Sequence, residues 1–208
     1  MLLTAALLAA SALSLTTAAP LTKIRSTLTA DTIIAIAPLT ASCVNAPADA
    51  PGECRTAAQA AGPIAKSFTK YGIDSAGEQA ALIALMLFES GNFKYNKNHY
   101  PAPGRPGQGT RNMQLPGLNL QYAASLFGAA TVQEAGDATA VLNLVGGDDE
   151  SFGSAAWFLK TQCSQTIREG LASKADPLTG WQNYLTGCVG TTLDPQRTEI
   201  WTTTRQFI

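Results

Sequence analysis

An unbroken apolar run from Ala80 to Phe88 is the strongest hydrophobic pattern in the body of the chain. Alanine, leucine and methionine make up most of it, and these residues favour α-helix. Ser75 and Glu78 precede the run at the spacing of a capping box, and Gly91 follows it as a left-handed helix exit. A helix that is apolar on every side lies in a protein interior. The pattern therefore predicts a buried central helix.

Further helices are indicated by turn residues and by composition. Aspartate followed by proline, at Asp176-Pro177 and Asp194-Pro195, places a capping residue before the first position of two short helices. No strand alternation, βαβ rhythm or internal repeat is visible, so the predicted fold class is mainly α in a single domain. The other predicted helices are Arg55–Tyr71 with an interruption at Gly62-Pro63, Leu118–Phe127, one from Thr131 toward Val145, and one from Asp148 toward Leu171.

Composition limits the partners. The chain has 208 residues, of which 46% are hydrophobic and 14% charged, and its formal net charge is −1. This length suits one domain with a sizeable core. Nucleic acid and anionic membrane are excluded as main partners, because phosphate binding requires a clustered basic face and the chain has no large block of either charge. A monomer without stable membrane insertion is expected.

The first 42 residues differ from the rest of the chain. Residues 1–18 are uncharged, apolar and rich in alanine and leucine, and they end in small residues, as a secretory signal peptide does. Residues 19–42 are rich in threonine and alanine, and the sequence leaves open a pro-segment, an N-terminal arm or a short strand. The folded domain is assigned to residues 43–208, and the protein is expected to be secreted and extracellular.

The four cysteines fit an oxidising compartment and two disulfides. Three pairings are possible, and the two local ones are favoured because each closes one modest loop. These pairs are Cys43–Cys54 and Cys163–Cys188. A zinc site is disfavoured, since the chain has no C-x-x-C spacing and its single histidine is His99. No metal and no cofactor is expected.

Glu89 ends the apolar run, so the predicted helix places a carboxyl group at its C-terminal end. Loss of water and the negative end of the helix dipole both disfavour the charged form there. A carboxyl group that stays protonated is what a general acid for glycosidic cleavage requires. The alternative is a glutamate that points into solvent at a frayed helix end.

Residues 92–115 form a long segment rich in glycine, proline and asparagine. Loops of this length in compact domains are usually functional or disordered. The segment carries Tyr95 and Tyr100 and has no acidic residue. It is either a solvated basic loop or a rim of donors and aromatic faces beside Glu89, on which sugar rings stack. Its basic residues are Lys94, Lys97, His99, Arg105 and Arg111.

Four short segments, in order across residues 75–188, resemble a known family. Phe88–Phe93 resembles the E-S-G segment of soluble lytic transglycosylases and goose-type lysozymes, and Gly109–Gln114 resembles their G-x-M-Q segment. Ala155–Leu159 and Asn183–Gly187 are similar to two further segments of these proteins. The resemblance implies a lysozyme-like catalytic domain built around the buried central helix, with a cleft beside the end of that helix.

The resemblance also implies roles for individual residues. Glu89 is the implied general acid/base, Ser90 supports it, and Tyr184 lies close to it. Two departures put the substrate in doubt: Leu185 replaces an asparagine of the family, and the middle segment is two residues longer. The expected substrate-binding residues are Ser90, Tyr95, Tyr100, Asn112, Met113, Gln114, Asn183 and Tyr184.

The number of acidic residues bears on the mechanism. No Asp or Glu lies between Glu89 and Glu134, and the acidic residues at 148–150 are better explained as a helix N-terminus. A single acid favours lytic transglycosylase chemistry over glycosidases that use two carboxylates. The prediction is a glycoside hydrolase or lytic transglycosylase that cleaves a β-1,4-linked aminosugar polymer. The favoured polymer is the peptidoglycan of cell walls. A chitin- or chitosan-acting hydrolase and a non-catalytic secreted carbohydrate-binding effector are the alternatives.

Overall fold

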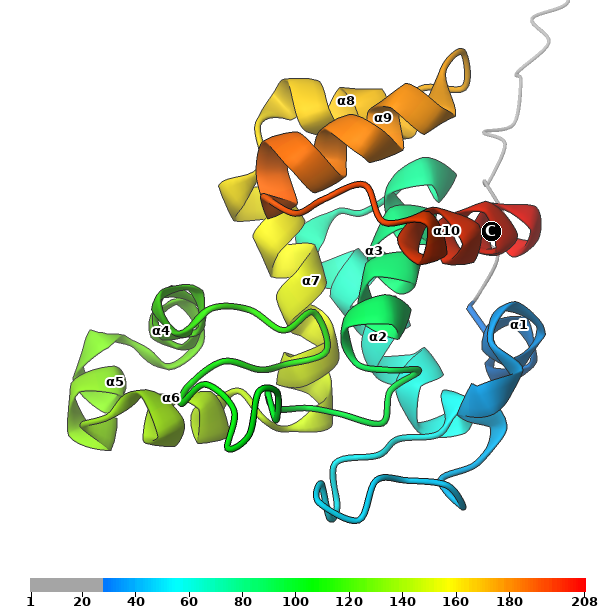
Figure 1. Ribbon diagram of the computed structural model, residues 1–208. Helices are drawn as coiled ribbons and strands as arrows, with labels where there is room; N and C mark the ends of the chain where they lie inside the picture. Colours follow the sequence, from blue (N-terminus) through cyan, green and yellow to red (C-terminus); the bar gives the residue numbers. More distant parts are fainter. Residues whose placement is uncertain (1–27) are drawn as a thin grey trace, which may run out of the picture.

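The computed structural model describes residues 28–208, and these residues fold into α-helices joined by loops, with isolated bridges but no strand (Figure 1). The mainly α class is confirmed. The helices are α1 (Ala30–Ile36), α2 (Ala57–Tyr71), α3 (Ala76–Glu89), α4 (Pro116–Phe127), α5 (Ala129–Ala135), α6 (Ala138–Leu144), α7 (Asp148–Gln162), α8 (Gln165–Ala172), α9 (Pro177–Tyr184) and α10 (Pro195–Phe207), with a short 3-10 helix at Pro38–Ala41 and a π-helical turn at Leu185–Val189.

Helix α3 is the buried central helix that the apolar run predicts. Every side chain from Ala80 to Leu87 is at most 2% exposed, and α7, α8 and α10 pack against the helix. The Ser75 hydroxyl accepts from the backbone N–H of Glu78 and donates to its carboxylate, which satisfies the start of the helix. Burial of this many apolar side chains is the main force that holds the domain together.

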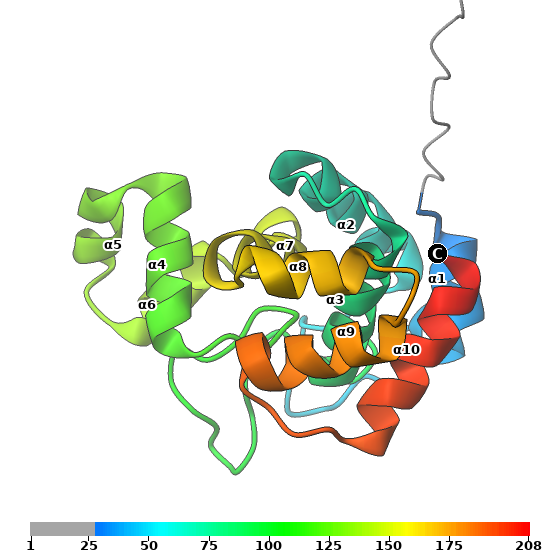
Figure 2. The ribbon, with the colours of Figure 1, turned by 90° about the horizontal axis from the view of Figure 1, so that it is seen from above.

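Helices α4, α5 and α6 form a group of their own on one side of the molecule (Figures 1 and 2). The long loop between α3 and α4 leads into this group, and the start of α7 leads out of it. Tyr122 on α4 joins the group to the central helices, because its ring lies 5.0 Å from that of Trp157 on α7. Of the described residues, no helix is long and apolar enough to cross a membrane.

Helix α2 runs without a break through Gly62-Pro63, so the predicted interruption is wrong. A proline inside a helix clashes with the Cβ of the residue before it, and that residue is here a glycine with no Cβ. A capping box between Thr56 and Gln59 and a left-handed Gly72 close the two ends of the helix. Packing along α7 and these caps offset the hydrogen bond that Pro63 cannot donate.

Two of the longer predicted helices are each divided in two. The segment from Thr131 toward Val145 breaks at Gly136, whose φ is +83°, and Asp137 then caps α6 by accepting from the N–H of Ala140. The segment from Asp148 toward Leu171 breaks at Cys163, which is extended. There the chain is tied to Cys188 by a disulfide, and Ser164 caps α8.

Several local predictions are confirmed. The two disulfides are Cys43–Cys54 and Cys163–Cys188, with Cα–Cα distances of 5.9 and 5.4 Å. Asp176 and Asp194 cap α9 and α10, and each is followed by a proline at the first helical position. Helix α4 ends at Phe127, the predicted last residue, and begins at Pro116, two residues before the predicted start.

The predicted signal peptide, residues 1–18, lies outside the described residues, as does the start of the predicted arm at 19–42. From residue 28 onward that arm belongs to the folded body. Helix α1 packs against α2 and α10, with Ile33 fully buried and Ile36 only 7% exposed. Of the alternatives for this segment, the described part is therefore a helix on the domain and not a strand.

Helices α8 and α9 approach each other so closely at Gly180 that any side chain there would overlap with Gly170. A Cβ added to Gly180 would lie 2.2 Å from the carbonyl oxygen of Gly170. Gly180→Ala is therefore expected to lower the free energy of unfolding by about 1–3 kcal/mol, as overpacking does.

The matched control is Gly117→Ala in the first turn of α4, where nothing lies within 4 Å of the new Cβ. Alanine favours helix over glycine, so this variant is expected to gain up to about 1 kcal/mol. Urea denaturation of both variants measures the difference. Equal effects at the two positions would contradict the close approach of α8 and α9.

Candidate functional site

The end of α3 places Glu89 in an ion pair. Its Oε1 accepts from Nη1 of Arg197 on α10, and the guanidinium lies 3.9 Å from the centre of the Phe88 ring. The side chains of Glu89 and Arg197 are 19% and 11% exposed. Glu89 is therefore neither a frayed glutamate in solvent nor an isolated acid, because a cation neutralises its charge within the fold.

Tyr184, the last residue of α9, is fully buried close to Glu89. Burial raises the pKa of Tyr184 above its ordinary value, and the negative charge of Glu89 adds to the effect. The Tyr184 hydroxyl has no hydrogen-bond partner among the residues that the structure describes. Trp181, one turn earlier, stacks on Trp201 of α10 with ring centres 5.5 Å apart. The expected proximity of Tyr184 and Glu89 is present, in a setting dominated by packing.

Gln114 and Asn112 are buried, and other side chains hold them. The Gln114 side-chain amide donates to Oδ1 of Asn119 at 3.0 Å, while its own Oε1 has no hydrogen-bond partner within residues 28–208. Asn112 Oδ1 accepts from the hydroxyls of Thr110 and Ser154, at 2.9 and 2.6 Å. Gln114 thus ties the loop in front of α4 to α4 itself, and Asn112 ties the same loop to α7.

The remaining predicted site residues are spread over different settings. The Ser90 hydroxyl donates to the Met86 carbonyl at 2.6 Å and accepts from the Phe93 N–H, so it finishes the last turn of α3. Tyr100 is 85% exposed at the loop tip. The others are Tyr95, whose ring lies 5.6 Å from that of His99, Met113, which has a φ of +49°, and Asn183, which is exposed on α9.

Arg111 is not part of a solvated basic rim, because it is fully buried. Its Nη1 donates to the carbonyls of Phe93 and Tyr95, each at 2.9 Å, and its Nη2 donates to the carbonyl of Glu53 at 2.7 Å. Burial lowers the pKa of Arg111 to about 10, with a smaller contribution from the positive charge of Arg55. Arg111 therefore joins the loop after α3 to the disulfide loop.

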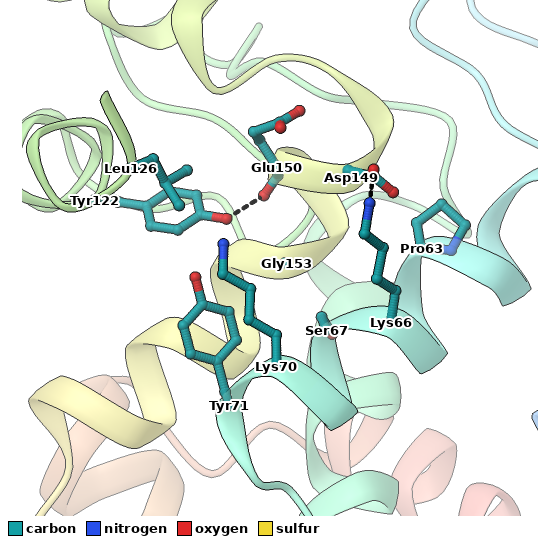
Figure 3. A pocket seen from close by; sticks show the side chains of 10 residues that line it. All are labelled: Pro63, Lys66, Ser67, Lys70, Tyr71, Tyr122, Leu126, Asp149, Glu150 and Gly153. Carbon is teal, nitrogen blue, oxygen red and sulfur yellow. Dashed lines mark hydrogen bonds and ion pairs between the residues drawn. The ribbon is translucent and has the colours of Figure 1, made fainter. Parts of the chain in front are cut away.

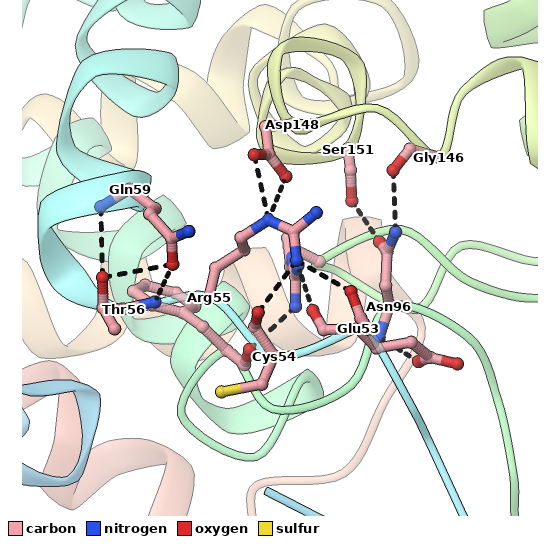
Figure 4. Close-up of polar contacts among 12 residues, drawn as sticks. Glu53, Cys54, Arg55, Thr56, Gln59, Asn96, Gly146, Asp148 and Ser151 are labelled. Carbon is pink, nitrogen blue, oxygen red and sulfur yellow. Dashed lines mark hydrogen bonds and ion pairs between the residues drawn. The ribbon is translucent and has the colours of Figure 1, made fainter. Parts of the chain in front are cut away.

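Polar contacts around Glu53 complete this junction (Figure 4). Its Oε2 accepts from the backbone N–H groups of Asn96 and Lys97, at 2.6 and 2.9 Å, and its Oε1 pairs with His99 at 2.8 Å. Figure 4 also shows Arg55 directed at the Asp148 carboxylate, with Nε 2.7 and 2.9 Å from the two oxygens. The disulfide loop, the loop after α3 and the start of α7 form one connected network.

Sequence reasoning missed Arg197, Glu53 and the structural role of Arg111. Arg197 is 108 positions from its partner Glu89, and Glu53 is 46 from His99. No spacing rule links residues so far apart. The sequence offers one signal for Arg197: Asp194-Pro195 predicts the start of a helix, and Arg197 lies in the first turn of that helix.

Metal-ligating residues are dispersed in this chain. All four cysteines form disulfides, and the single histidine, His99, pairs with Glu53. Across residues 28–208, no three or more His, Cys, Asp or Glu side chains gather to hold a metal ion. The donor set of the described residues therefore does not fit a metal centre.

A groove of about 500 Å³ lies between α4, α5 and α6. Leu120 at its wall is 49% exposed, so the groove presents apolar surface to solvent. Of the described residues that line the groove, two have polar side chains, Gln133 and Asp137. The apolar lining is Pro116, Leu120, Ala124, Ala129, Val132, Ala138 and Val141, with two glycines beside it.

Other hollows of the described residues are smaller or more highly charged. The niche between α2, α4 and α7 has a volume of only about 80 Å³, and Figure 3 shows it beside the Lys66–Asp149 ion pair and the hydrogen bond from the Tyr122 hydroxyl to the Glu150 carbonyl. Two larger hollows, of about 560 and 620 Å³, border α3. Each contains cationic and anionic side chains, among them Arg168 and Arg205.

Comparison with curated proteins gives a match to a protein of Fusarium oxysporum (strain Fo5176) named a bifunctional dioxygenase (DOX)-epoxy alcohol synthase (EAS). The two are 49% identical over 150 residues, which covers 66% of this chain and 11% of the relative. This chain thus spans only a small part of the length of the relative that it matches. No protein-family model matches, and no solved structure matches.

This relative contradicts the predicted function. Dioxygenation and epoxy alcohol synthesis are not glycosidic cleavage, so the prediction of a glycosidase or lytic transglycosylase is wrong. The cell-wall partner, peptidoglycan or a chitin-like polymer, and the carbohydrate-binding alternative are wrong with it. The geometry supplies a physical reason. Glu89 is paired with Arg197, and the side chains of Ser90 and Asn112, which lie in the segments that resemble lytic transglycosylases, make hydrogen bonds within the fold.

Proposed function

We propose that this chain is an exported, disulfide-linked binding domain that holds an apolar small molecule with oxygen-bearing groups. The proposed site is the groove between α4, α5 and α6, and the proposed ligand class is a long-chain epoxy alcohol. The scaffold is proposed to be lysozyme-like, supported by the buried central α3 and by the resemblance of the four sequence segments. The two disulfides support export.

The apolar groove is the observation that carries the proposal. Its volume of about 500 Å³ falls within the range of small-molecule sites, roughly 300–1,000 Å³. Such sites combine an apolar lining with a few polar groups that orient the ligand. Here Leu120, Val132 and Val141 supply apolar walls, and Gln133 and Asp137 supply polar groups. An apolar chain that carries a hydroxyl or an epoxide matches both features.

The relative supports the same ligand class through its name, which specifies an epoxy alcohol. The matched part is 11% of that bifunctional protein. A segment of this size suits an accessory domain better than a domain that carries out both named activities. An epoxy alcohol has an apolar skeleton and two adjacent oxygen functions, so it needs a groove with a mostly apolar wall. Binding, and not oxygenation, is therefore the proposed role.

The test is a titration of the purified chain with a long-chain epoxy alcohol, followed by calorimetry. Leu120→Asp is expected to weaken binding by roughly tenfold or more, because the ligand would have to bury a carboxylate in apolar surroundings. Leu178→Asp is the matched control, since Leu178 is 44% exposed on α9 and does not line the groove. This control is expected to bind as the parent does.

Two outcomes would contradict the proposal. One is an absence of heat or saturation with the epoxy alcohol for the parent chain. The other is equal affinity in Leu120→Asp and Leu178→Asp, which would move the site away from the groove. Thermal unfolding of each variant without ligand checks that the folded state is intact.

A further inference from the structure

The loop between α3 and α4 carries three cations, Lys94, Lys97 and Arg105, that pair with no carboxylate of the described residues. Lys94 donates to the carbonyl of Asn45, and Lys97 donates to the side-chain oxygen of Asn143, each at 3.2 Å. Arg105 is exposed. None of these three cations takes part in an ion pair of the described residues.

Other cations of the described residues also lack an ion pair, among them Lys70, Lys160 and Lys174; this loop differs in holding three such cations within residues 94–105. Arg55, Arg168 and Arg197 each pair with a carboxylate, and Arg111 is buried. Residues 92–115 contain no Asp or Glu. The carboxylate of Glu53, which contacts this loop, is occupied by His99 and by two backbone N–H groups. The local charge is therefore available to an anionic partner.

Tyr100 stands at the tip of this loop and is 85% exposed. The tip is closed by hydrogen bonds, from the N–H of Gly104 to the Pro101 carbonyl at 2.7 Å and from the N–H of Arg105 to the Asn98 side chain at 2.9 Å. Gly104 has a φ of +88°, and a Cβ there would lie 2.0 Å from the Asn98 carbonyl oxygen. The aromatic ring is thus presented by an ordered turn.

We propose that Lys94, Lys97, Tyr100 and Arg105, here named the basic loop face, dock an acidic stretch of polypeptide. Figure 2 shows the loop between α3 and α4 projecting beyond the helices, where a partner can reach it. Tyrosine and arginine are the side chains that most often dominate protein interfaces, and a pre-ordered turn lowers the entropic cost of association. The three cations set the sign of the partner's charge.

A polypeptide fits this face better than other polyanions. In the Fusarium relative the matched segment is 11% of one continuous chain, so the remaining polypeptide is covalently attached to it and can contact it. Binding to nucleic acid is dominated by many phosphate contacts, and three cations make few. Stable attachment to a membrane needs a larger apolar surface than one exposed tyrosine.

The test is calorimetric titration of the purified chain with poly-L-glutamate at low salt. Lys94→Glu/Lys97→Glu/Arg105→Glu is expected to weaken binding by roughly thirtyfold, and Tyr100→Ala by several fold, through loss of charge and of aromatic contact. The control is Lys70→Glu/Lys160→Glu/Lys174→Glu, three exposed lysines elsewhere on the molecule. It changes the net charge equally and is expected to bind within about threefold of the parent.

Three results would overturn the proposal: no binding by the parent, equal loss in the two triple variants, or no loss in either. Heparin and vesicles that contain phosphatidylserine are the comparison probes. If they bind with the same dependence on the basic loop face while poly-L-glutamate does not, the proposal also fails. Epoxy alcohol binding by Tyr100→Ala is expected to equal that of the parent, so this inference and the groove ligand fail separately.

Discussion

Replacing Arg111 with methionine is expected to lower the free energy of unfolding by about 3–4 kcal/mol. Methionine fills much of the same space but donates no hydrogen bond. The carbonyls of Tyr95 and Glu53 then lose the donors that now lie 2.9 and 2.7 Å away, while the Phe93 carbonyl keeps the backbone N–H of Arg55 at 2.9 Å. Each buried polar group left without a partner costs about 1–3 kcal/mol, and removal of a buried charge offsets part of the sum.

Urea denaturation measures this effect, and Arg105→Met is the control in the same loop. Arg105 is exposed, so its replacement is expected to change the unfolding free energy by no more than about 0.5 kcal/mol. Arg111→Lys is expected to fall in between, since one ammonium group cannot span the three carbonyls. If Arg111→Met were as stable as the control, the loop would not depend on this guanidinium.

Local signals in the sequence were enough to place most helices. Ser75, Asp176 and Asp194 act within three residues of themselves, by satisfying the first N–H groups of a helix. The apolar run of α3 predicted its burial because no other surroundings accept a helix without a polar face. The two disulfides followed from short separations, 11 and 25 residues. These features depend on neighbours along the chain.

Contacts between distant segments decided what the sequence did not reveal. Gly62 permits Pro63 inside a continuous helix, which a general rule on prolines does not anticipate. The local sequence predicts an exposed Arg111 in a basic loop. It is buried because carbonyls from the start of the same loop and from the disulfide loop accept its hydrogen bonds. The groove beside Leu120 exists only because α5 and α6 fold back on α4.

The mistaken function has the same origin. Short segments of common residue types suggested a sugar-cleaving site, and the prediction that Glu89 works as an isolated proton donor assumed that nothing else reached it. Arg197, on a helix more than a hundred residues later in the chain, contacts Glu89 and supplies the positive charge that pairs with it. A pattern of local segments therefore described the packing around α3 and did not identify the chemistry.

Removing this cation is expected to produce the second large effect. Arg197→Leu leaves the Glu89 carboxylate, 19% exposed, beside the buried Tyr184 without an ion-pair partner. A mostly buried charge that loses its partner costs about 3–5 kcal/mol, and the lower end applies here because some solvent reaches Glu89. The contact of the guanidinium with the Phe88 ring, at 3.9 Å, is lost as well. Chemical denaturation of the variant measures the loss.

The double variant Glu89→Leu/Arg197→Leu separates the ion pair from general packing. If the two side chains act as a pair, the double variant is expected to be more stable than Arg197→Leu alone, with a coupling energy of about 1–3 kcal/mol. Two leucines of similar bulk leave no unpaired charge between α3 and α10, and such replacements are often neutral. Strictly additive losses would contradict the pairing. They would mean that α10 is held in place by its other packing contacts with α3 and by the stacking of Trp201 on Trp181 of α9.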